Sequence, residues 1–196
     1  MINFIAFEGL DGSGLSTQAA LTRDYLQSKN KNVLLTKEPT DGLIGGLIKS
    51  SLKKEWKTTS LTLQLLFAAD RAQHLQNEVE TSIKKGKIVI VDRYILSTLA
   101  YGIVDIPLNF LKQINLNFRK PDLTFMIDAH PKICLQRIKK SRFHAELFED
   151  EQKLDQVRKN YLSLKNFFSG TYIVDGNKTI EEVFKDVKKI VEKRLY

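Results

Sequence analysis

The sequence alternates short apolar runs with longer amphipathic segments, and this alternation limits its possible folds more than any other feature. Short apolar runs followed by polar or glycine-containing residues are typical of strands buried on both faces of a parallel sheet. Amphipathic segments between such strands predict helices that cover both faces. The pattern predicts an α/β fold of three layers, with parallel strands at residues 2–7, 33–36, 88–91, 123–127 and 172–174.

The amphipathic segments predict helices at residues 16–29, 43–52, 60–85, 107–118, 131–140, 149–168 and 180–196. The 196 residues contain no repeat and no Pro- or Ser-rich linker, so we expect a single domain over 1–196. One basic stretch, which begins at Lys139 and includes Arg142, lies between two of these helices. We interpret it as a mobile surface loop.

Composition excludes several classes of protein. Cys134 is the only cysteine, so it can form neither an intramolecular disulfide nor a thiolate zinc site. No export signal precedes the first apolar run, and the longest strongly apolar run, 88–91, is far shorter than the ~20 residues of a membrane helix. We therefore expect a soluble, cytoplasmic protein with no membrane partner. The formal net charge of +8 favours anionic partners.

A glycine-rich segment with the layout of a phosphate-binding P-loop follows the first expected strand. Its N–H groups and the N-terminus of the next helix would point at the anion. Ser16 stands where a hydroxyl would bind Mg²⁺, although a turn capped by Ser16 or Thr17 is an alternative. The strand–loop–helix context favours phosphate binding. The expected ATP-binding residues here are Gly9, Leu10, Asp11, Gly12, Ser13, Gly14, Leu15, Ser16 and Thr17.

Leu15 departs from the P-loop pattern, because the motif has a lysine at this position. A leucine side chain cannot donate a hydrogen bond to a phosphate oxygen. Losing one donor aimed at developing charge costs ~2.7–4 kcal/mol, on the order of 10²–10³ in rate. Either another cation compensates, or the chemistry is weak or absent, while phosphate binding through the backbone and Mg²⁺ need not fail.

Four segments, in the same order along the chain, resemble the thymidylate kinase family. They are 7–12 (Phe-Glu-Gly-Leu-Asp-Gly), 37–40 (Lys-Glu-Pro-Thr), 66–71 (Leu-Phe-Ala-Ala-Asp-Arg) and 92–101, which begins Asp-Arg-Tyr and ends Ala-Tyr. The last is specific to this family among P-loop proteins. The resemblance spans nearly the whole chain and implies a P-loop kinase fold with a mobile lid at about 139–150. It also implies transfer of the γ-phosphate of ATP to dTMP with Mg²⁺, which gives dTDP for dTTP biosynthesis.

The resemblance implies which residues bind dTMP. Phe67 and Arg71 share one helix face and would stack on thymine and hydrogen-bond its carbonyl edge, whereas spacing alone favours a core Phe and a surface Arg. Thr98 would complete recognition of the base. Tyr101 would pack beside the sugar, although a half-buried core tyrosine is equally plausible without the resemblance. Lys37 stands where many members have an arginine that contacts the acceptor phosphate.

Charged residues beside the expected strand ends are the catalytic and metal-binding candidates. Asp92 ends a buried strand, where its carboxylate can reach Mg²⁺, with capping of the next segment as the alternative. Arg93 can clamp a phosphate with two N–H donors, and in the family the matching arginine touches the acceptor phosphate and the transferred group. In the family, the residue matching Asp11 holds the sugar 3′-hydroxyl and helps organise the metal, while a turn-stabilising role is the alternative.

Members of the family supply a further catalytic arginine from the P-loop or from the lid. Gly12 occupies the P-loop position and Arg142 lies in the expected lid, so the sequence resembles the second type. Arg137, just before the lid, is the expected platform for adenine, because a planar guanidinium can stack on a base. A solvated, charged loop is the alternative for the lid.

Phosphoryl transfer requires alignment and charge neutralisation rather than a catalytic histidine. We therefore interpret His74, His130 and His144 as surface residues. The resemblance implies a homodimer formed through helices on one flank of the sheet, with the apolar face of 60–85 as a candidate surface.

Three rival functions remain open. A deoxynucleoside kinase would use Glu38 to deprotonate a sugar 5′-hydroxyl, and Leu15 motivates a catalytically impaired nucleotide-binding homologue. Nucleic-acid binding is suggested only by the net charge, because no aromatic-interleaved basic stretch supports it. We expect ATP and dTMP as partners and no nucleic acid.

Overall fold

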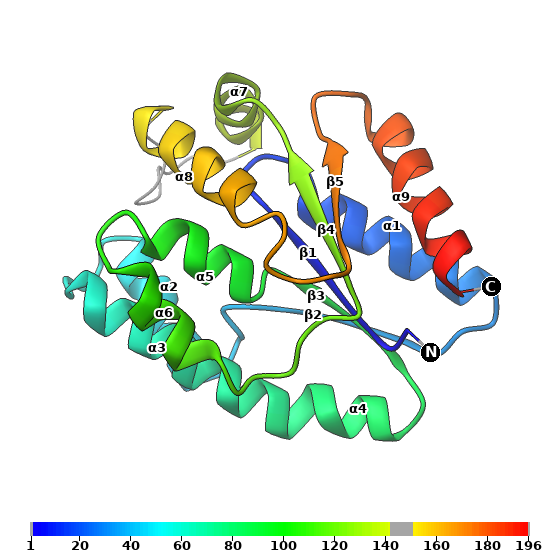
Figure 1. The fold of residues 1–196 in the computed structure, drawn as a ribbon, viewed down its shortest axis with the longest axis horizontal. Helices are drawn as coiled ribbons and strands as arrows, with labels where there is room; N and C mark the ends of the chain where they lie inside the picture. The colour runs from blue at the N-terminus through cyan, green and yellow to red at the C-terminus, as the bar shows by residue number, and fades with distance from the viewer. Residues whose placement is uncertain (1, 142–150, 196) are drawn as a thin grey trace.

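The computed structural model describes residues 2–141 and 151–195, and its centre is a five-stranded, fully parallel sheet (Figure 1). The strands lie in the order β2-β3-β1-β4-β5. Phe7 on β1 is in register with Asp92 on β3, and Gly9 with Ile127 on β4, so the ends of three strands meet at one edge. The predicted α/β fold is confirmed. The strands are β1 (Phe4–Gly9), β2 (Val33–Lys37), β3 (Ile88–Asp92), β4 (Leu123–Asp128) and β5 (Thr171–Asp175).

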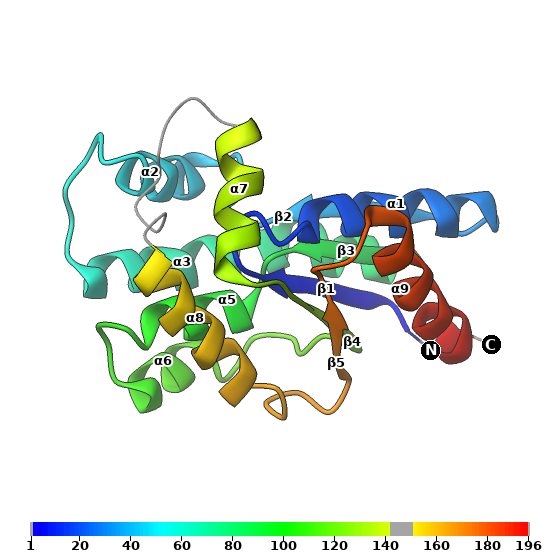
Figure 2. The same ribbon diagram turned by 90° about the horizontal axis from the view of Figure 1, so that it is seen from above.

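Helices cover both faces of the sheet, as Figure 2 shows. Side chains alternate along β1: Ile5 and Phe7 pack against α1 and α9, whereas Phe4 and Ala6 face the layer that contains α5 and α8. No helix in 2–141 and 151–195 combines the length and the apolar character needed to cross a membrane. The helices are α1 (Leu15–Ser28), α2 (Leu43–Leu52), α3 (Ser60–His74), a π-helical turn η1 (Leu75–Val79), α4 (Glu80–Lys84), α5 (Ile95–Gly102), α6 (Leu108–Asn115), α7 (Pro131–Ser141), α8 (Glu151–Ser163) and α9 (Ile180–Leu195).

The observed helices differ from the prediction in three places. Helix α5 was not predicted, because nearly all of its side chains are buried and it therefore lacks an amphipathic pattern. The predicted helix 60–85 contains the turn η1, whose wider winding brings both Leu75 and Val79 into the core. The helix predicted to reach residue 168 ends at Ser163; Leu164 and Phe168 are still buried, and their spacing imitated a helical stripe. Residues 142–150 of the expected lid lie outside the described residues.

Candidate active site

A cavity of about 760 Å³ opens beyond the C-terminal ends of the strands, where ligands bind in open α/β sheets. It brings together nearly all of the site residues predicted from the sequence. The exceptions are Gly9, whose carbonyl accepts a hydrogen bond from the lining residue Arg93, and Arg142, which lies outside the described residues. The predicted residues that line it are Leu10, Asp11, Gly12, Ser13, Gly14, Leu15, Ser16, Thr17, Lys37, Phe67, Arg71, Asp92, Arg93, Thr98, Tyr101 and Arg137.

The P-loop leads directly into α1. Gly14, with φ of 97°, caps this helix, and a non-glycine residue would be strained in that backbone conformation. At Gly12 a Cβ atom would lie 2.4 Å from the carbonyl oxygen of Cys134 on α7, so the backbone of α7 leaves no room for a side chain. Leu15 is 3% exposed and belongs to the apolar cluster under α1 and α9. The position that carries lysine in the motif is therefore part of the core here.

Ser16 and Asp92 are the candidate metal-binding pair. Burial raises the pKa of Asp92, and the nearby charge of Arg93 and the hydrogen bond from Ser16 only partly offset that effect. Among the described residues no group of three or more His, Cys, Asp or Glu side chains could hold a metal ion. One hydroxyl and one carboxylate are oxygen ligands that fit Mg²⁺, which binds a few protein oxygens, water and substrate phosphates.

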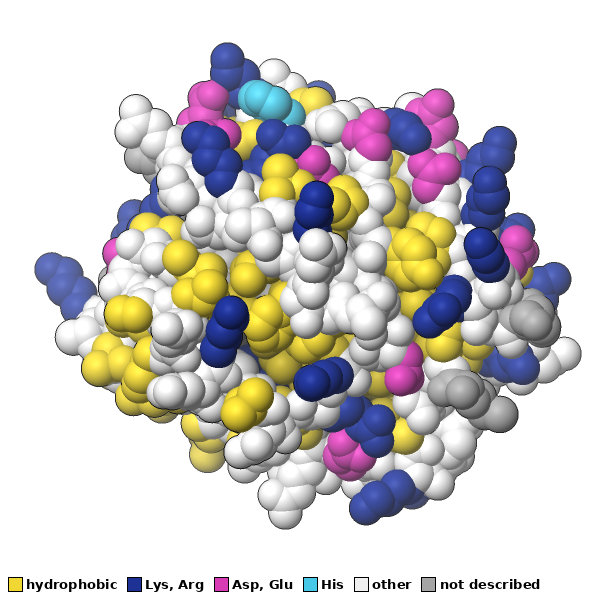
Figure 3. Space-filling model, viewed as in Figure 1, with side chains coloured by type: hydrophobic (Ala, Val, Ile, Leu, Met, Phe, Trp, Pro, Cys, Tyr) yellow, Lys and Arg dark blue, Asp and Glu magenta, His cyan; other side chains and the backbone are white. Residues whose placement is uncertain are grey.

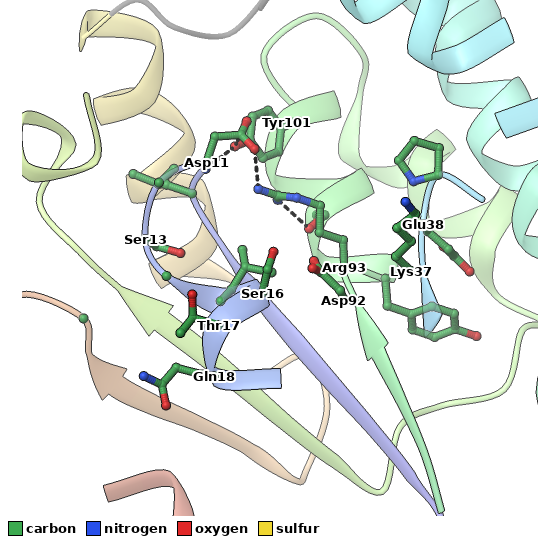
Figure 4. A pocket seen from close by; sticks show the side chains of 18 of the residues that line it. Asp11, Ser13, Ser16, Thr17, Gln18, Lys37, Glu38, Asp92, Arg93 and Tyr101 are labelled. Carbon is green, nitrogen blue, oxygen red and sulfur yellow. Dashed lines mark hydrogen bonds and ion pairs between the residues drawn. The ribbon is translucent and has the colours of Figure 1, made fainter. Parts of the chain in front are cut away.

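Arg93 is fixed between the P-loop and α5 (Figure 4). Its Nη2 lies 2.7 Å from Oδ1 of Asp11, and its Nη1 donates to the carbonyl of Gly9 at 2.8 Å. Tyr101 donates to Oδ2 of Asp11 at 3.1 Å and accepts from the backbone N–H of Asp11 at 3.2 Å. Burial would lower the pKa of Arg93, but Asp11 and the other acidic groups around it together outweigh burial and raise the pKa well above its usual value. Arg93 is thus a permanent, oriented cation at the cavity wall.

A buried network that the sequence did not predict lies behind Arg93. Glu8 accepts the backbone N–H of Leu96 at 2.9 Å and the hydroxyl of Ser97. Ser97 also contacts the hydroxyl of Tyr161 on α8, with 2.7 Å between the two oxygens. Burial raises the pKa of Glu8 to about 7, although the Ser97 hydrogen bond and the charge of Arg93 act in the opposite direction. This network holds the start of α5, and therefore Arg93, against β1.

Arg71 is enclosed at the opposite wall of the cavity. It is 1% exposed, so the alternative of a surface arginine is wrong. Its Nη2 donates to Oγ1 of Thr98 at 2.9 Å, its Nε donates to Oε2 of Glu38 at 2.9 Å, and its Nη1 bonds to Oδ1 of Asn115. The centroid of the Tyr94 ring lies 4.9 Å from its Cζ. These contacts engage all three nitrogens of the guanidinium and so fix its orientation at the cavity wall.

His74 corrects the prediction that the histidines are surface residues. It is 5% exposed, its Nδ1 lies 3.0 Å from Oε1 of Glu38, and its Nε2 lies 3.1 Å from Oε2 of Glu78. Burial would lower the pKa of His74, but the two carboxylates outweigh burial and raise it. Arg71, His74 and Glu78 are spaced three and four residues apart on one helical run, and this spacing could have indicated that His74 lies beside charged partners. His130 is exposed, as predicted, and His144 lies outside the described residues.

Basic side chains from several elements border the cavity. Arg137 donates from Nη1 to the carbonyls of Ser13 and Gly176, at 3.1 and 3.0 Å, so its guanidinium joins the P-loop to the loop after β5. Lys37 and Lys49 both approach Oδ1 of Asp41, at 3.3 and 2.5 Å. Lys49 lines the cavity as well, so it is a candidate, beside Arg93, for the cation that compensates for Leu15. An anion-binding loop, a fixed arginine and flanking lysines can together orient and neutralise phosphates.

Comparisons with known proteins agree with this geometry. A model of the thymidylate kinase family matches residues 7–187. A probable thymidylate kinase from Pyrococcus horikoshii is 38% identical, over 98% of this chain and 97% of its own. The thymidylate kinase of Thermosipho africanus is 37% identical, over 98% of each chain. A probable thymidylate kinase from Pyrobaculum aerophilum is 39% identical, over 97% of this chain and 96% of its own. The chain therefore belongs to the thymidylate kinase family.

Proposed function

We propose that this protein transfers the γ-phosphate of ATP to dTMP and thereby produces dTDP. The observation that carries the proposal is that the P-loop and Arg93 line the same cavity as Phe67, Arg71 and Thr98. A phosphate donor on the loop and a nucleotide acceptor against α3 and α5 would both reach Arg93. Names of full-length relatives support the same reaction.

The donor half of the cavity suits ATP. The P-loop N–H groups and the N-terminus of α1 would hold its phosphates. Ile180 and Val183 on α9 provide an apolar wall, and Arg137 provides a flat cation beside it on which adenine would stack. Ser16 and Asp92 would hold Mg²⁺, which neutralises phosphate charge when bound.

The acceptor half suits a thymine deoxynucleotide. Phe67 would stack on the base, and Arg71 and Thr98 would bond its polar edge. Tyr101 and Asp11 would contact the sugar, and Lys37 the acceptor phosphate. That phosphate is largely ionised near pH 7, because its second pKa is about 6, so the reaction needs no strong general base. Arg93 would neutralise charge as the phosphoryl group moves.

The burial of Glu38 argues against a deoxynucleoside kinase. A general base must have a carboxylate oxygen within reach of the substrate proton. Here Oε2 of Glu38 is bonded to Arg71, Oε1 lies 3.0 Å from Nδ1 of His74, and the side chain is 3% exposed. Basic side chains on the face drawn in Figure 3 are interspersed with acidic and apolar ones and form no continuous stripe, which gives nucleic-acid binding no support there.

An assay of ADP release with ATP, Mg²⁺ and a panel of acceptors tests the proposal. We expect turnover with dTMP, little with thymidine, and less with dCMP than with dTMP. Turnover with thymidine but not with dTMP would establish the deoxynucleoside kinase. Wild-type protein that binds ATP and dTMP without turnover, together with turnover by Leu15→Lys, would establish the impaired homologue.

We also propose a homodimer formed through α2 and α3. These two helices pack on each other and expose pairs of leucines four residues apart. Leu43 is 91% exposed and Leu47 47%, and Leu61 and Leu65 are 44% and 46% exposed. A paired apolar surface of this kind is typical of an interface. Sedimentation should give twice the mass of one chain, and Leu43→Glu with Leu61→Glu should give the monomer; a monomeric wild type at micromolar concentration would contradict the proposal.

A further inference from the structure

Gln64 lies on α3, one turn before Phe67, and its side chain lines the large cavity. The residue is 4% exposed, and its Oε1 is buried without a hydrogen-bond partner among residues 2–141 and 151–195. A buried amide without a partner is destabilising, because it has lost its bonds to water and gained none from the protein. Its place at the wall of a ligand cavity points to a bond that forms only with a ligand.

The amide of Gln64 packs against the end of α5. A Cβ atom on Gly102 would lie 3.1 Å from its Cδ and 3.2 Å from its Oε1. Thr98 and Tyr101 of the same helix also line the cavity. A half-turn of the amide exchanges its oxygen and nitrogen, so either atom can meet a ligand.

The neighbouring polar groups are mostly engaged or can only donate. Arg71 carries N–H donors alone, and the hydroxyl of Thr98 accepts one of them, which leaves this hydroxyl one donor and one lone pair for a base. Both oxygens of Glu38 are engaged, by Arg71 and His74. A thymine edge presents an imide N–H beside carbonyl oxygens, so it needs an acceptor as well as donors. The amide of Gln64 offers an acceptor next to a donor, and its oxygen has no partner within the described part of the wall.

We propose that Gln64 is a specificity-determining residue of the acceptor site, whose amide oxygen accepts the imide N–H of the pyrimidine. Its amide nitrogen then donates to an adjacent carbonyl, while Arg71 donates to the other side of the base. This inference rests on the proposed function, since it assumes that the acceptor is a thymine nucleotide. It adds a residue to the base contacts inferred from Phe67, Arg71 and Thr98.

The test compares Gln64→Met with the wild type in two measurements, the Tm of the free protein and the Kd for dTMP without ATP, measured by calorimetry. Methionine fills the same space without polar atoms. Removing an unsatisfied amide should raise the Tm by about 2–4 °C. Losing the bonds to the base should weaken dTMP binding by about tenfold. A side chain with a purely structural role cannot give opposite signs in the two measurements.

Two other glutamines supply controls. Gln18 is also buried, and its Oε1 likewise has no hydrogen-bond partner among the described residues, but its Nε2 donates to the carbonyl of Ile180 at 3.0 Å. Gln18→Leu loses that bond and should therefore lower the Tm. Gln113 is exposed on α6, and Gln113→Leu should change neither measurement. Gln64→Leu, an apolar side chain of another shape, should repeat the weaker binding.

The 3′-deoxy analogue of dTMP distinguishes a contact of Gln64 with the base from a contact with the sugar 3′-hydroxyl. We expect the same loss of affinity for this analogue, because its base is intact. A loss that disappears with the analogue would assign Gln64 to the sugar hydroxyl and overturn the proposal. An unchanged Kd for dTMP, or a Tm that falls together with the affinity, would also overturn it. Wild-type protein that binds dTMP without turnover would contradict the proposed function and still leave the binding test decisive.

Discussion

Replacement of Arg93 by alanine should reduce turnover more than it reduces binding of either nucleotide. The guanidinium is held by Asp11 at 2.7 Å and by the carbonyl of Gly9 at 2.8 Å. It therefore needs little reorganisation when negative charge develops on the transferred phosphoryl group. Removing one such donor costs ~2.7–4 kcal/mol, on the order of 10²–10³ in kcat. Because Leu15 supplies no cation, we expect the upper end of this range for Arg93→Ala.

Arg93→Lys keeps the charge and should still lower kcat by about tenfold or more, because one ammonium cannot bridge Asp11 and Gly9 and also offer a fork to a phosphate. Arg119 provides a matched control: it forms a two-bond pair with Glu80, at 2.7 and 3.1 Å, and does not line the cavity. Arg119→Lys should leave kcat unchanged. Steady-state kinetics with ATP and dTMP varied separately measures both effects. Turnover of Arg93→Ala within threefold of the wild type would refute the catalytic role of this arginine.

Three further changes test other parts of the site. Leu15→Lys should leave kcat unchanged or raise it, and should lower the free energy of unfolding by about 1.5–3 kcal/mol, because a 3% exposed leucine leaves the core; a large fall in kcat would be contrary to this view. Gly12→Arg should reduce ATP binding, because a Cβ atom at this position would lie 2.4 Å from the carbonyl oxygen of Cys134. Calorimetric titration measures the Kd for ATP, and an unchanged Kd would contradict this reasoning. The pKa of Glu8 is raised from 4.5 to about 7, so its contribution to stability is complete below pH 4.5 and is lost as the pH rises through about 7. Glu8→Gln should therefore reduce the fall in the free energy of unfolding across this pH range. Urea titrations at several pH values measure this dependence. The same pH dependence in the wild type and the variant would show that burial does not raise the pKa of Glu8.

The sequence predicted the parts of the site that are local in the chain. The P-loop, Asp92 and Arg93 each follow directly from a strand, and parallel strands bring their ends to one edge, so their meeting could be predicted from the order of elements. The strands were placed within one or two residues of their observed ends for the same reason, since their apolar runs are continuous.

The remaining contacts depend on packing between distant elements. Glu38, His74 and Asn115 surround Arg71 only because α3 and α6 pack together below the end of β2, and periodicity does not fix that packing. Helix α5 escaped prediction because it is buried on nearly all sides. Gln64 gave no signal, since an amide without a partner can be recognised only once its surroundings are known.

The most direct test of the account is to identify the product that receives the γ-phosphate. The wild-type protein is incubated with γ-labelled ATP, Mg²⁺ and unlabelled dTMP, and the nucleotides are separated. We expect the label in dTDP, at a rate that falls by about 10²–10³ in Arg93→Ala. Label found only in inorganic phosphate, or retained entirely in ATP while both nucleotides bind, would contradict the claim that this P-loop without its lysine supports transfer to dTMP.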